Sequence, residues 1–437
     1  MQADGACVGH IQSAAPDQRE YHPASWIDSA KLPGIVGLVK SSILGVLSFA
    51  CVCATSLQGA DWPHFRGPDR NGISQETGWF PQGAKLNEVW KKQVGLGFSC
   101  VSVVGDRAYT VGYADKKDTI SCLNTKDGSV VWAYDYKATK GALFYQGGTS
   151  ATPTIEGGRL YHCSRPGEVF CLDAKTGKLI WQKHLKEDYD IPKPTWGFAS
   201  SPLVLGNRIF LNAGEAGAAL DKSDGGLIWK SGKKEAGYAT PVPVTVDGQS
   251  RLALFAEKEI IMVASADGAE IWRERFATSW EQNSTDPLIY QDRMFVTGHN
   301  KKGKMFKLSD GSEVEDFETE VKAHVNAGVV IGDHMYVVNG KIHSSRATLD
   351  CIDLKTGEAK WSRKGLGVGA LSAADGKLII IGEKGKFVVA EASTAGFKPL
   401  VEAQLLEEPC WSQPTLANGQ VYVRDGKGTL VCLSFTK

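Results

Sequence analysis

Residues that could perform chemistry are present in this chain, but they rarely stand at spacings typical of an active site. The nine histidines include no His-Glu-x-x-His pair of the kind that binds zinc in metalloproteases. The chain also has no Gly-x-Ser-x-Gly nucleophile motif and no phosphate-binding Walker loop. The glycine-rich stretch 365–369 precedes an expected strand rather than a helix, so it does not predict a phosphate site. These patterns disfavour hydrolase and nucleotide chemistry.

The charge balance disfavours a second class, the nucleic-acid-binding proteins. The 437 residues contain 49 Lys and Arg against 49 Asp and Glu, which gives a formal net charge of zero. Affinity for nucleic acids depends largely on cationic side chains that neutralise phosphates. We therefore expect no nucleic acid among the partners.

The first sixty residues resemble a leader rather than a folded domain. Lys31 and Lys40 precede an apolar run at 43–54, and small residues follow up to Ala60. A core of about twelve apolar residues is too short to span a bilayer as a helix, which takes about 20, but it suits a secretory signal. We expect a leader over 1–60, no transmembrane span after its removal, and a location in the periplasm or cell envelope. Cys51 and Cys53 leave lipidation open, although the Leu expected three residues before a lipidated Cys is absent.

One hairpin phrase recurs from residue 122 onward and defines an internal repeat. It reads Cys/Ala-x-Asp-x-x-Thr/Asp-Gly-x-x-x-Trp, as in the stretches 171–181 and 351–361. Its glycines stand 39 to 49 residues apart, at Gly128, Gly177, Gly225, Gly268, Gly311, Gly357 and Gly396. In each phrase the Gly supplies a positive φ for a tight turn between two strands. The chain is therefore one structural unit copied many times.

A second phrase counts the units independently. It resembles Gly-Asp-Arg-x-Tyr, as at 105–109, and it occurs eight times up to Tyr422. Each unit of 40 to 50 residues holds four short antiparallel strands, which is the period of a β-propeller blade. The sequence therefore predicts an all-β protein, an eight-bladed propeller over 87–437 preceded by a lead-in segment at 61–86.

The two ends of the repeat predict how the ring closes. The last unit stops at Lys437 before its Trp strand, whereas Trp90 lies in a Trp strand that precedes the first unit. An N-terminal strand can therefore complete the eighth blade and leave no free sheet edge. Blades five and seven carry Glu315 and Leu400 in place of the repeat Trp, so we expect weaker contacts there. The structural tryptophans of the repeat are Trp90, Trp132, Trp181, Trp229, Trp272 and Trp361.

Cysteines follow the repeat and therefore predict packing rather than cross-linking. Four of the seven past residue 60 share one hairpin position: Cys122, Cys171, Cys351 and Cys432. Equivalent positions in different blades lie too far apart for the roughly 4.4–6.8 Å Cα spacing of a disulfide. We interpret them as small buried side chains.

The hairpin phrases resemble the repeat of the quinoprotein-like (PQQ-like) β-propellers, over about residues 61–435. The stretch Asp61-Trp-Pro-His-Phe-Arg-Gly-Pro68 resembles the start of exported bacterial members that are similar to BamB, a subunit of the outer-membrane barrel assembly machinery. The resemblance implies one of two functions, because some members are calcium- and PQQ-dependent alcohol dehydrogenases and others are scaffolds without a cofactor.

The dehydrogenase pattern that the resemblance implies is incomplete in this chain. It has no adjacent cysteines, such as those that cover the quinone in these enzymes, and no Cys-x-x-Cys-His haem motif. Calcium in that family is bound by Glu, Asn and Asp oxygens, and the nearest local set is Glu281, Asn283 and Asp286. We matched no Asp to the catalytic base.

The segments that lead into the blades should gather at one rim of the central channel. Three tryptophans outside the repeat position, Trp196, Trp280 and Trp411, fall in these segments, beside Tyr, Asn and Gln. Such side chains suit planar ligands, sugars or an inserted peptide loop, although they could also only plug the channel mouth. We expect one shared cavity with the candidate ligand-binding residues Tyr145, Trp196, Glu281, Asn283, Asn326 and Trp411.

Two functions follow as hypotheses. The preferred one is an exported, non-enzymatic scaffold without a cofactor or metal, which binds a protein or glycan partner of the cell envelope at the rim. The alternative is a PQQ- and calcium-dependent alcohol or polymer-alcohol dehydrogenase.

Overall fold

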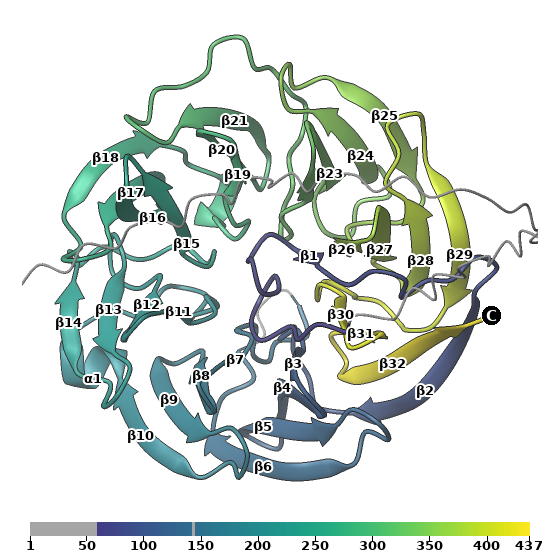
Figure 1. Cartoon of the computed structure of the whole chain (residues 1–437). Helices are drawn as coiled ribbons and strands as arrows, with labels where there is room; N and C mark the ends of the chain where they lie inside the picture. The colour runs from purple at the N-terminus through teal and green to yellow at the C-terminus, as the bar shows by residue number, and fades with distance from the viewer. Residues whose placement is uncertain (1–58, 142–144) are drawn as a thin grey trace, which may run out of the picture. The chain divides into compact units, whose positions relative to one another are not determined.

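Eight small antiparallel sheets are arranged in a ring around a central channel (Figure 1). The computed structural model describes residues 59–141 and 145–437. The expected leader lies outside the described residues up to residue 58, which includes its apolar core at 43–54 and both Cys51 and Cys53. Within the part that is described, the predicted eight-bladed propeller is confirmed.

The first four blades each contain four strands, in chain order from the channel outward (Figure 1). Blade 1 comprises β3 (Ser102–Val104), β4 (Arg107–Ala114), β5 (Lys117–Asn124) and β6 (Val130–Lys137). Blade 2 comprises β7 (Thr154–Glu156), β8 (Arg159–Cys163), β9 (Glu168–Asp173) and β10 (Leu179–His184). Blade 3 comprises β11 (Leu203–Leu205), β12 (Arg208–Leu211), β13 (Ala218–Asp221) and β14 (Leu227–Lys230). Blade 4 comprises β15 (Val242–Val246), β16 (Gln249–Phe255), β17 (Glu259–Ala264) and β18 (Glu270–Arg275).

The last four blades are less uniform. Blade 5 comprises β19 (Leu288–Tyr290), β20 (Arg293–Gly298) and β21 (Lys301–Lys307). Blade 6 comprises β22 (Val329–Ile331), β23 (His334–Asn339), β24 (Thr348–Asp353) and β25 (Ala359–Lys364). Blade 7 comprises β26 (Ala370–Ala374), β27 (Lys377–Ile381), β28 (Lys386–Glu391), β29 (Lys398–Gln404) and the short parallel strand β1 (Ile73–Ser74). Blade 8 comprises β30 (Thr415–Ala417), β31 (Gln420–Arg424), β32 (Thr429–Thr436) and β2 (Lys85–Gln93).

Helical structure is limited to two short pieces among the described residues, α1 (Leu185–Tyr189) and the 3-10 turn η1 (Ser279–Glu281). Neither is long and apolar enough to cross a bilayer as a helix.

The N-terminal strand closes the ring as the sequence predicts. β2 pairs antiparallel with β32 from Lys85 to Gln93, and Trp90 lies opposite Cys432 in this pairing. The same register places Trp132 opposite Cys122 and Trp181 opposite Cys171. Strands from opposite ends of the chain therefore form one blade that repeats the geometry of the others.

The repeat tryptophans connect neighbouring blades. Each indole Nε1 donates a hydrogen bond of 2.8–3.2 Å to a backbone carbonyl in the turn of the next blade. For five of the six, the ring also lies directly over the turn glycine: a Cβ added there would come within 2.5–2.8 Å of the ring. These glycines are Gly128, Gly177, Gly225, Gly268 and Gly311. Glycine is therefore required both by its positive φ and by the indole above it.

Other residues fill the two contacts that lack a repeat Trp. Blade 5 has three strands because the acidic stretch around Glu315 is exposed and keeps only one bridge, between Phe306 and Glu313. Phe317 packs edge-on against Phe295 in the core between blades 5 and 6. Between blades 7 and 8, Trp79 packs against Phe435 in a shared core. The lead-in segment thus supplies the aromatic ring that Leu400 does not.

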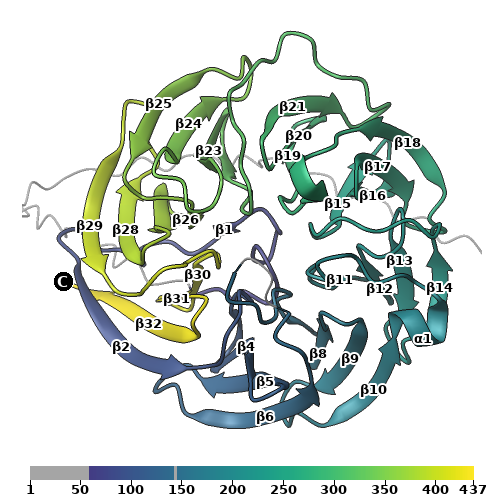
Figure 2. The ribbon, with the colours of Figure 1, turned by 180° about the vertical axis from the view of Figure 1, so that it is seen from behind.

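A plug segment, residues 61–78, crosses the middle of the ring (Figure 1, Figure 2). Its buried Arg66 donates through Nη2 to the carbonyl of Gly328, at 3.0 Å. Further hydrogen bonds reach five other blades: Trp62 with Val103, Pro63 with Ile155, Arg70 with Val204, Gly72 with Ala373 and Glu76 with Gly419. The plug segment therefore ties blades 1, 2, 3, 6, 7 and 8 together across the channel.

Truncating a repeat Trp should destabilise the ring far more than truncating an exposed one. Trp181 is 9% exposed and packs in the core between blades 2 and 3, so we expect Trp181→Ala to cost about 3–5 kcal/mol. Trp280 is 76% exposed, so Trp280→Ala should change stability by less than about 0.5 kcal/mol. Chemical denaturation of both variants measures this, and equal losses would contradict the assignment of Trp181 to the scaffold.

Candidate functional site

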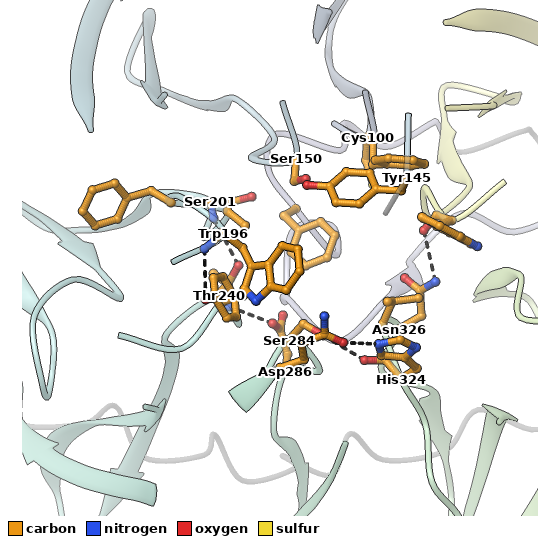
Figure 3. Close-up of a pocket in the computed structure, with 18 of the residues that line it drawn as sticks. Cys100, Tyr145, Ser150, Trp196, Ser201, Thr240, Ser284, Asp286, His324 and Asn326 are labelled. Atoms are coloured by element: carbon orange, nitrogen blue, oxygen red, sulfur yellow. Dashed lines mark hydrogen bonds between the residues drawn. The ribbon is translucent and has the colours of Figure 1, made fainter. Parts of the chain in front are cut away.

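A cavity of about 220 Å³ lies where the segments that lead into the blades converge (Figure 3). Every blade except blade 7 contributes to it through such a segment, and the plug segment contributes Phe65. Its walls are rich in aromatic side chains: Phe65, Phe98, Tyr145, Trp196, Phe198, Tyr238 and Trp411. The cavity is therefore assembled from residues far apart in sequence, on a rigid scaffold.

One wall is an aromatic stack built around Trp411. Phe98 stacks on Trp411 with ring centroids 4.8 Å apart, and Tyr145 lies 5.8 Å from Phe98 at a tilt. The indole Nε1 of Trp411 donates to Glu383 Oε1 at 3.3 Å. Asn326 fixes the backbone behind it, because its amide donates to the Trp411 carbonyl at 3.0 Å. Trp411 is thus held by residues of blades 6 and 7 and by the segment that leads into blade 1.

The opposite wall is formed by Trp196 and Tyr238. The backbone N–H of Trp196 donates to the Tyr238 hydroxyl at 3.3 Å, and Arg165 Nε donates to the Trp196 carbonyl at 2.8 Å. Figure 3 shows Trp196 and Tyr145 reaching into the cavity from different blades. Two aromatic faces on separate elements can hold a flat or apolar group between them.

The carboxylate of the cavity already has partners. Asp286 is buried, accepts a hydrogen bond from the Thr240 N–H at 2.8 Å and lies 4.0 Å from Arg66 Nε. Burial raises the pKa of Asp286 to about 6, although the charge of Arg66 acts in the opposite direction.

His324 is also held in a fixed state. Burial, together with the neighbouring His299, lowers its pKa to about 3, so the ring is neutral at pH 7. Its Nδ1 accepts a hydrogen bond from the Ile342 N–H, which leaves Nε2–H to donate to Gln282 Oε1 at 2.7 Å. With both ring nitrogens engaged, His324 positions the loops rather than offering a base to a ligand.

The structure brings four of the six predicted ligand-binding residues to the cavity: Tyr145, Trp196, Asn326 and Trp411. Glu281 and Asn283 are not among the residues that line it. Glu281 is half exposed and pairs with Lys258 at 3.0 Å. That the four lining residues bind a ligand stays a prediction.

Asn283 has a structural role, because its amide group forms hydrogen bonds within blade 4 and the loop that follows. Its Nδ2 donates to the carbonyls of Ala256 and Glu257 at 2.7 and 3.1 Å, and its Oδ1 accepts from the Thr278 hydroxyl at 2.7 Å. The side chain is completely buried. The signal that suggested a ligand residue, a polar side chain in a blade-entering loop, also fits a side chain that holds such a loop in place.

The six candidate residues left out further residues of the lining, among them Phe65, Arg165 and Tyr238. A signal existed for Tyr238, which begins the segment into blade 4 as Tyr145 and Trp196 begin those into blades 2 and 3. Phe65 lies in the stretch Trp62-Pro-His-Phe-Arg-Gly, whose only signal was its resemblance to the start of exported BamB-like proteins. Arg165 lies in a turn within blade 2, and no pattern pointed to it.

The cysteines are buried and free, as the repeat predicts. All seven between Cys100 and Cys432 are unpaired and buried. Burial raises the pKa of the Cys100 thiol, beside the cavity, to about 11, so it is protonated and unreactive at neutral pH.

Comparison with known proteins assigns the chain to a family. A family described as "Outer membrane protein assembly factor BamB", of PQQ-like repeats, matches residues 116–363, which is more than half of the chain. The chain belongs to this BamB-like family.

Individual relatives of this BamB-like chain include both an enzyme and an assembly factor. The quinoprotein alcohol dehydrogenase PedH of Pseudomonas putida is 31% identical over 137 residues, which are 30% of this chain and only 22% of PedH. The outer membrane protein assembly factor BamB of Yersinia pestis is 23% identical over 292 residues, covering 64% of this chain and 72% of that protein. The crystal structure of BamB from Moraxella catarrhalis superposes with a TM-score of 0.59 at 16% identity, over 80% of this chain and all of that one. The last likeness concerns the fold alone.

The structural role of Asn283 in this BamB-like propeller can be tested by substitution. Asn283→Ala leaves buried backbone carbonyls without a donor, so we expect it to cost about 1–3 kcal/mol of stability. The neighbouring Glu281→Gln, which breaks only an exposed ion pair, should cost less than about 0.5 kcal/mol. Urea denaturation of the two variants distinguishes them. Identical midpoints would show that the loop does not depend on the Asn283 amide.

Proposed function

We propose that the protein is an exported, non-enzymatic scaffold of the cell envelope that binds a protein or glycan partner at the channel rim. The observation that carries the proposal is the aromatic cavity, whose walls come from seven blade-entering segments and the plug segment. Its volume of about 220 Å³ lies below the roughly 300–1,000 Å³ typical of small-molecule and cofactor sites. A cavity of this size suits one or two side chains of a partner, or a single sugar ring.

The side chains of the cavity match those that dominate binding at interfaces. Tryptophan and tyrosine are enriched at such hot spots, where they bury a large apolar area at low entropic cost. Trp196 and Trp411 stand on opposite walls and are backed by Tyr238 and Phe98. Membership of a family described as an assembly factor supports a protein as the partner.

The second candidate is a PQQ- and calcium-dependent alcohol dehydrogenase, which the likeness to part of PedH favours. The residues do not fit the calcium ion that such an enzyme needs. Asn283 is occupied by backbone groups, Glu281 pairs with Lys258, and Asp286 pairs with Arg66. The three oxygen ligands suggested by the sequence thus lie in separate interactions.

A photo-crosslinking experiment tests the scaffold function. A photoreactive amino acid in place of Tyr145 lies in the cavity, whereas the same residue in place of Val130, 64% exposed on the outer strand β6, serves as the control. In cells that produce the protein, position 145 should crosslink a defined envelope protein or glycan. Adding Trp196→Ala and Trp411→Ala should abolish the crosslink. Position 130 should not give it.

The same protein tests the alternative. Incubated with PQQ and calcium, it should show no bound-quinone absorbance and no dye-linked oxidation of alcohols. If the protein gives both signals and the Trp411→Ala variant gives neither, the dehydrogenase function is right and the scaffold function is wrong.

A further inference from the structure

Three side chains that bind metals in other proteins meet behind Trp411, outside the aromatic cavity. His343 lies in the loop between β23 and β24, Glu383 follows β27, and Glu408 lies in the connection from β29 to β30. His343 Nδ1 is 3.2 Å from Glu408 Oε1 and 3.6 Å from Glu383 Oε1. One nitrogen and two carboxylate oxygens therefore lie within 4.8 Å of one another.

Glu383 is a buried carboxylate that lacks a permanent cation. Its side chain is 3% exposed, and it accepts N–H groups from Val368 at 3.1 Å, His343 at 2.8 Å and the Trp411 indole at 3.3 Å. Within the described part of the chain, no Lys or Arg forms an ion pair with it. Three N–H donors suit the ionised form, and a buried negative charge is costly unless a positive charge compensates it.

Glu408 increases this imbalance, because it places a second carboxylate beside the first. Its side chain is 39% exposed, and its oxygen faces His343 rather than a Lys or Arg of the described residues. Two carboxylates with a single imidazole between them form a site with net negative charge when the ring is neutral. A bound cation would neutralise it.

The spacing fits a small transition-metal ion better than calcium. Zn²⁺ binds His nitrogen at about 2.0–2.1 Å and carboxylate oxygen at about 2.0–2.2 Å, so tetrahedral ligands lie roughly 3.4 Å apart. The two separations from His343 Nδ1, 3.2 and 3.6 Å, bracket that value. An imidazole ligand also suits Zn²⁺ and its neighbours rather than the all-oxygen shell of Ca²⁺.

We propose that His343 Nδ1, Glu383 and Glu408 bind one divalent transition-metal ion of the Zn²⁺ type. The hydrogen bonds from the Trp411 indole and the His343 N–H orient the Glu383 carboxylate, as outer groups do around other metal ligands. The ion connects the loops of blades 6 and 7 with the segment that carries Trp411. It therefore fixes one wall of the cavity, whatever that cavity binds.

Titration calorimetry on tag-free protein, with Zn²⁺ as the probe, tests the site. We expect one ion per chain at this site, bound more tightly than Ca²⁺. His343→Asn and Glu408→Gln should each weaken Zn²⁺ binding at least about tenfold, because even second-shell changes typically cost 10- to 100-fold. The matched control is Glu407→Gln, next to Glu408 but paired with Lys427, which should leave binding unchanged.

A fluorescence readout distinguishes this site from other histidines. Zn²⁺ should change the tryptophan emission, and Trp411→Phe should remove that change while His299→Asn should not. Three results would each overturn the proposal. They are an unchanged Zn²⁺ affinity in both the His343 and Glu408 variants, a loss of Zn²⁺ binding in His299→Asn alone, and no binding at millimolar Zn²⁺. The proposed function is tested by a separate experiment, because the crosslink from position 145 is measured without a Zn²⁺ titration.

Discussion

The contact between the indole of one blade and the glycine turn of the next sets the geometry of this propeller. Trp132, for example, covers Gly177 and donates to the Ala174 carbonyl at 3.0 Å. Because the ring and the hydrogen bond act together, they fix both the distance and the rotation between two sheets. Repeated around the ring, this contact determines where the blade-entering segments converge, and thus the shape of the cavity.

The ring would remain open without the residues that precede the first blade. β2 completes blade 8, Trp79 fills the contact next to blade 7, and the plug segment bonds to six blades. The same segment delivers Phe65 to the cavity. Closure and part of the candidate site therefore depend on one stretch of chain.

The repeat allowed most of the fold to be predicted, since each hairpin carries its own turn glycine and Trp. Trp90 and the truncated last unit were enough to predict closure, because a missing strand and a spare strand stand at opposite ends. The substitute rings, Phe317 and Trp79, were not predictable, since they lie outside the repeat position. They also fill the contacts that we expected to be weaker, so the absence of a Trp at Glu315 and Leu400 does not leave a gap.

The candidate site was predictable only in part, for a physical reason. Aromatic rings in blade-entering segments pointed correctly to the cavity at Trp196 and Trp411, which line it, but not at Trp280, which is 76% exposed and lies outside it. A polar side chain such as Asn283 carries no such signal, since an amide can serve a ligand or the backbone equally well. The proposed metal-binding cluster could not be predicted from the sequence for another reason: its three residues lie in three separate segments that only the folded ring brings together.

A double-mutant cycle on Trp132 and Gly177 tests the central interaction most directly. Gly177→Ala adds a Cβ that would lie 2.5 Å from the Trp132 ring, and it also strains a backbone with a φ of +73°. The backbone strain at residue 177 is the same when Trp132 is already Ala, whereas the clash between the added Cβ and the indole ring is then absent. Measured by chemical denaturation, the two substitutions should therefore be coupled by more than about 1 kcal/mol, with Gly177→Ala much less harmful in the Trp132→Ala background. Additive effects, within about 0.5 kcal/mol, would contradict the account and leave the glycine explained by its φ alone.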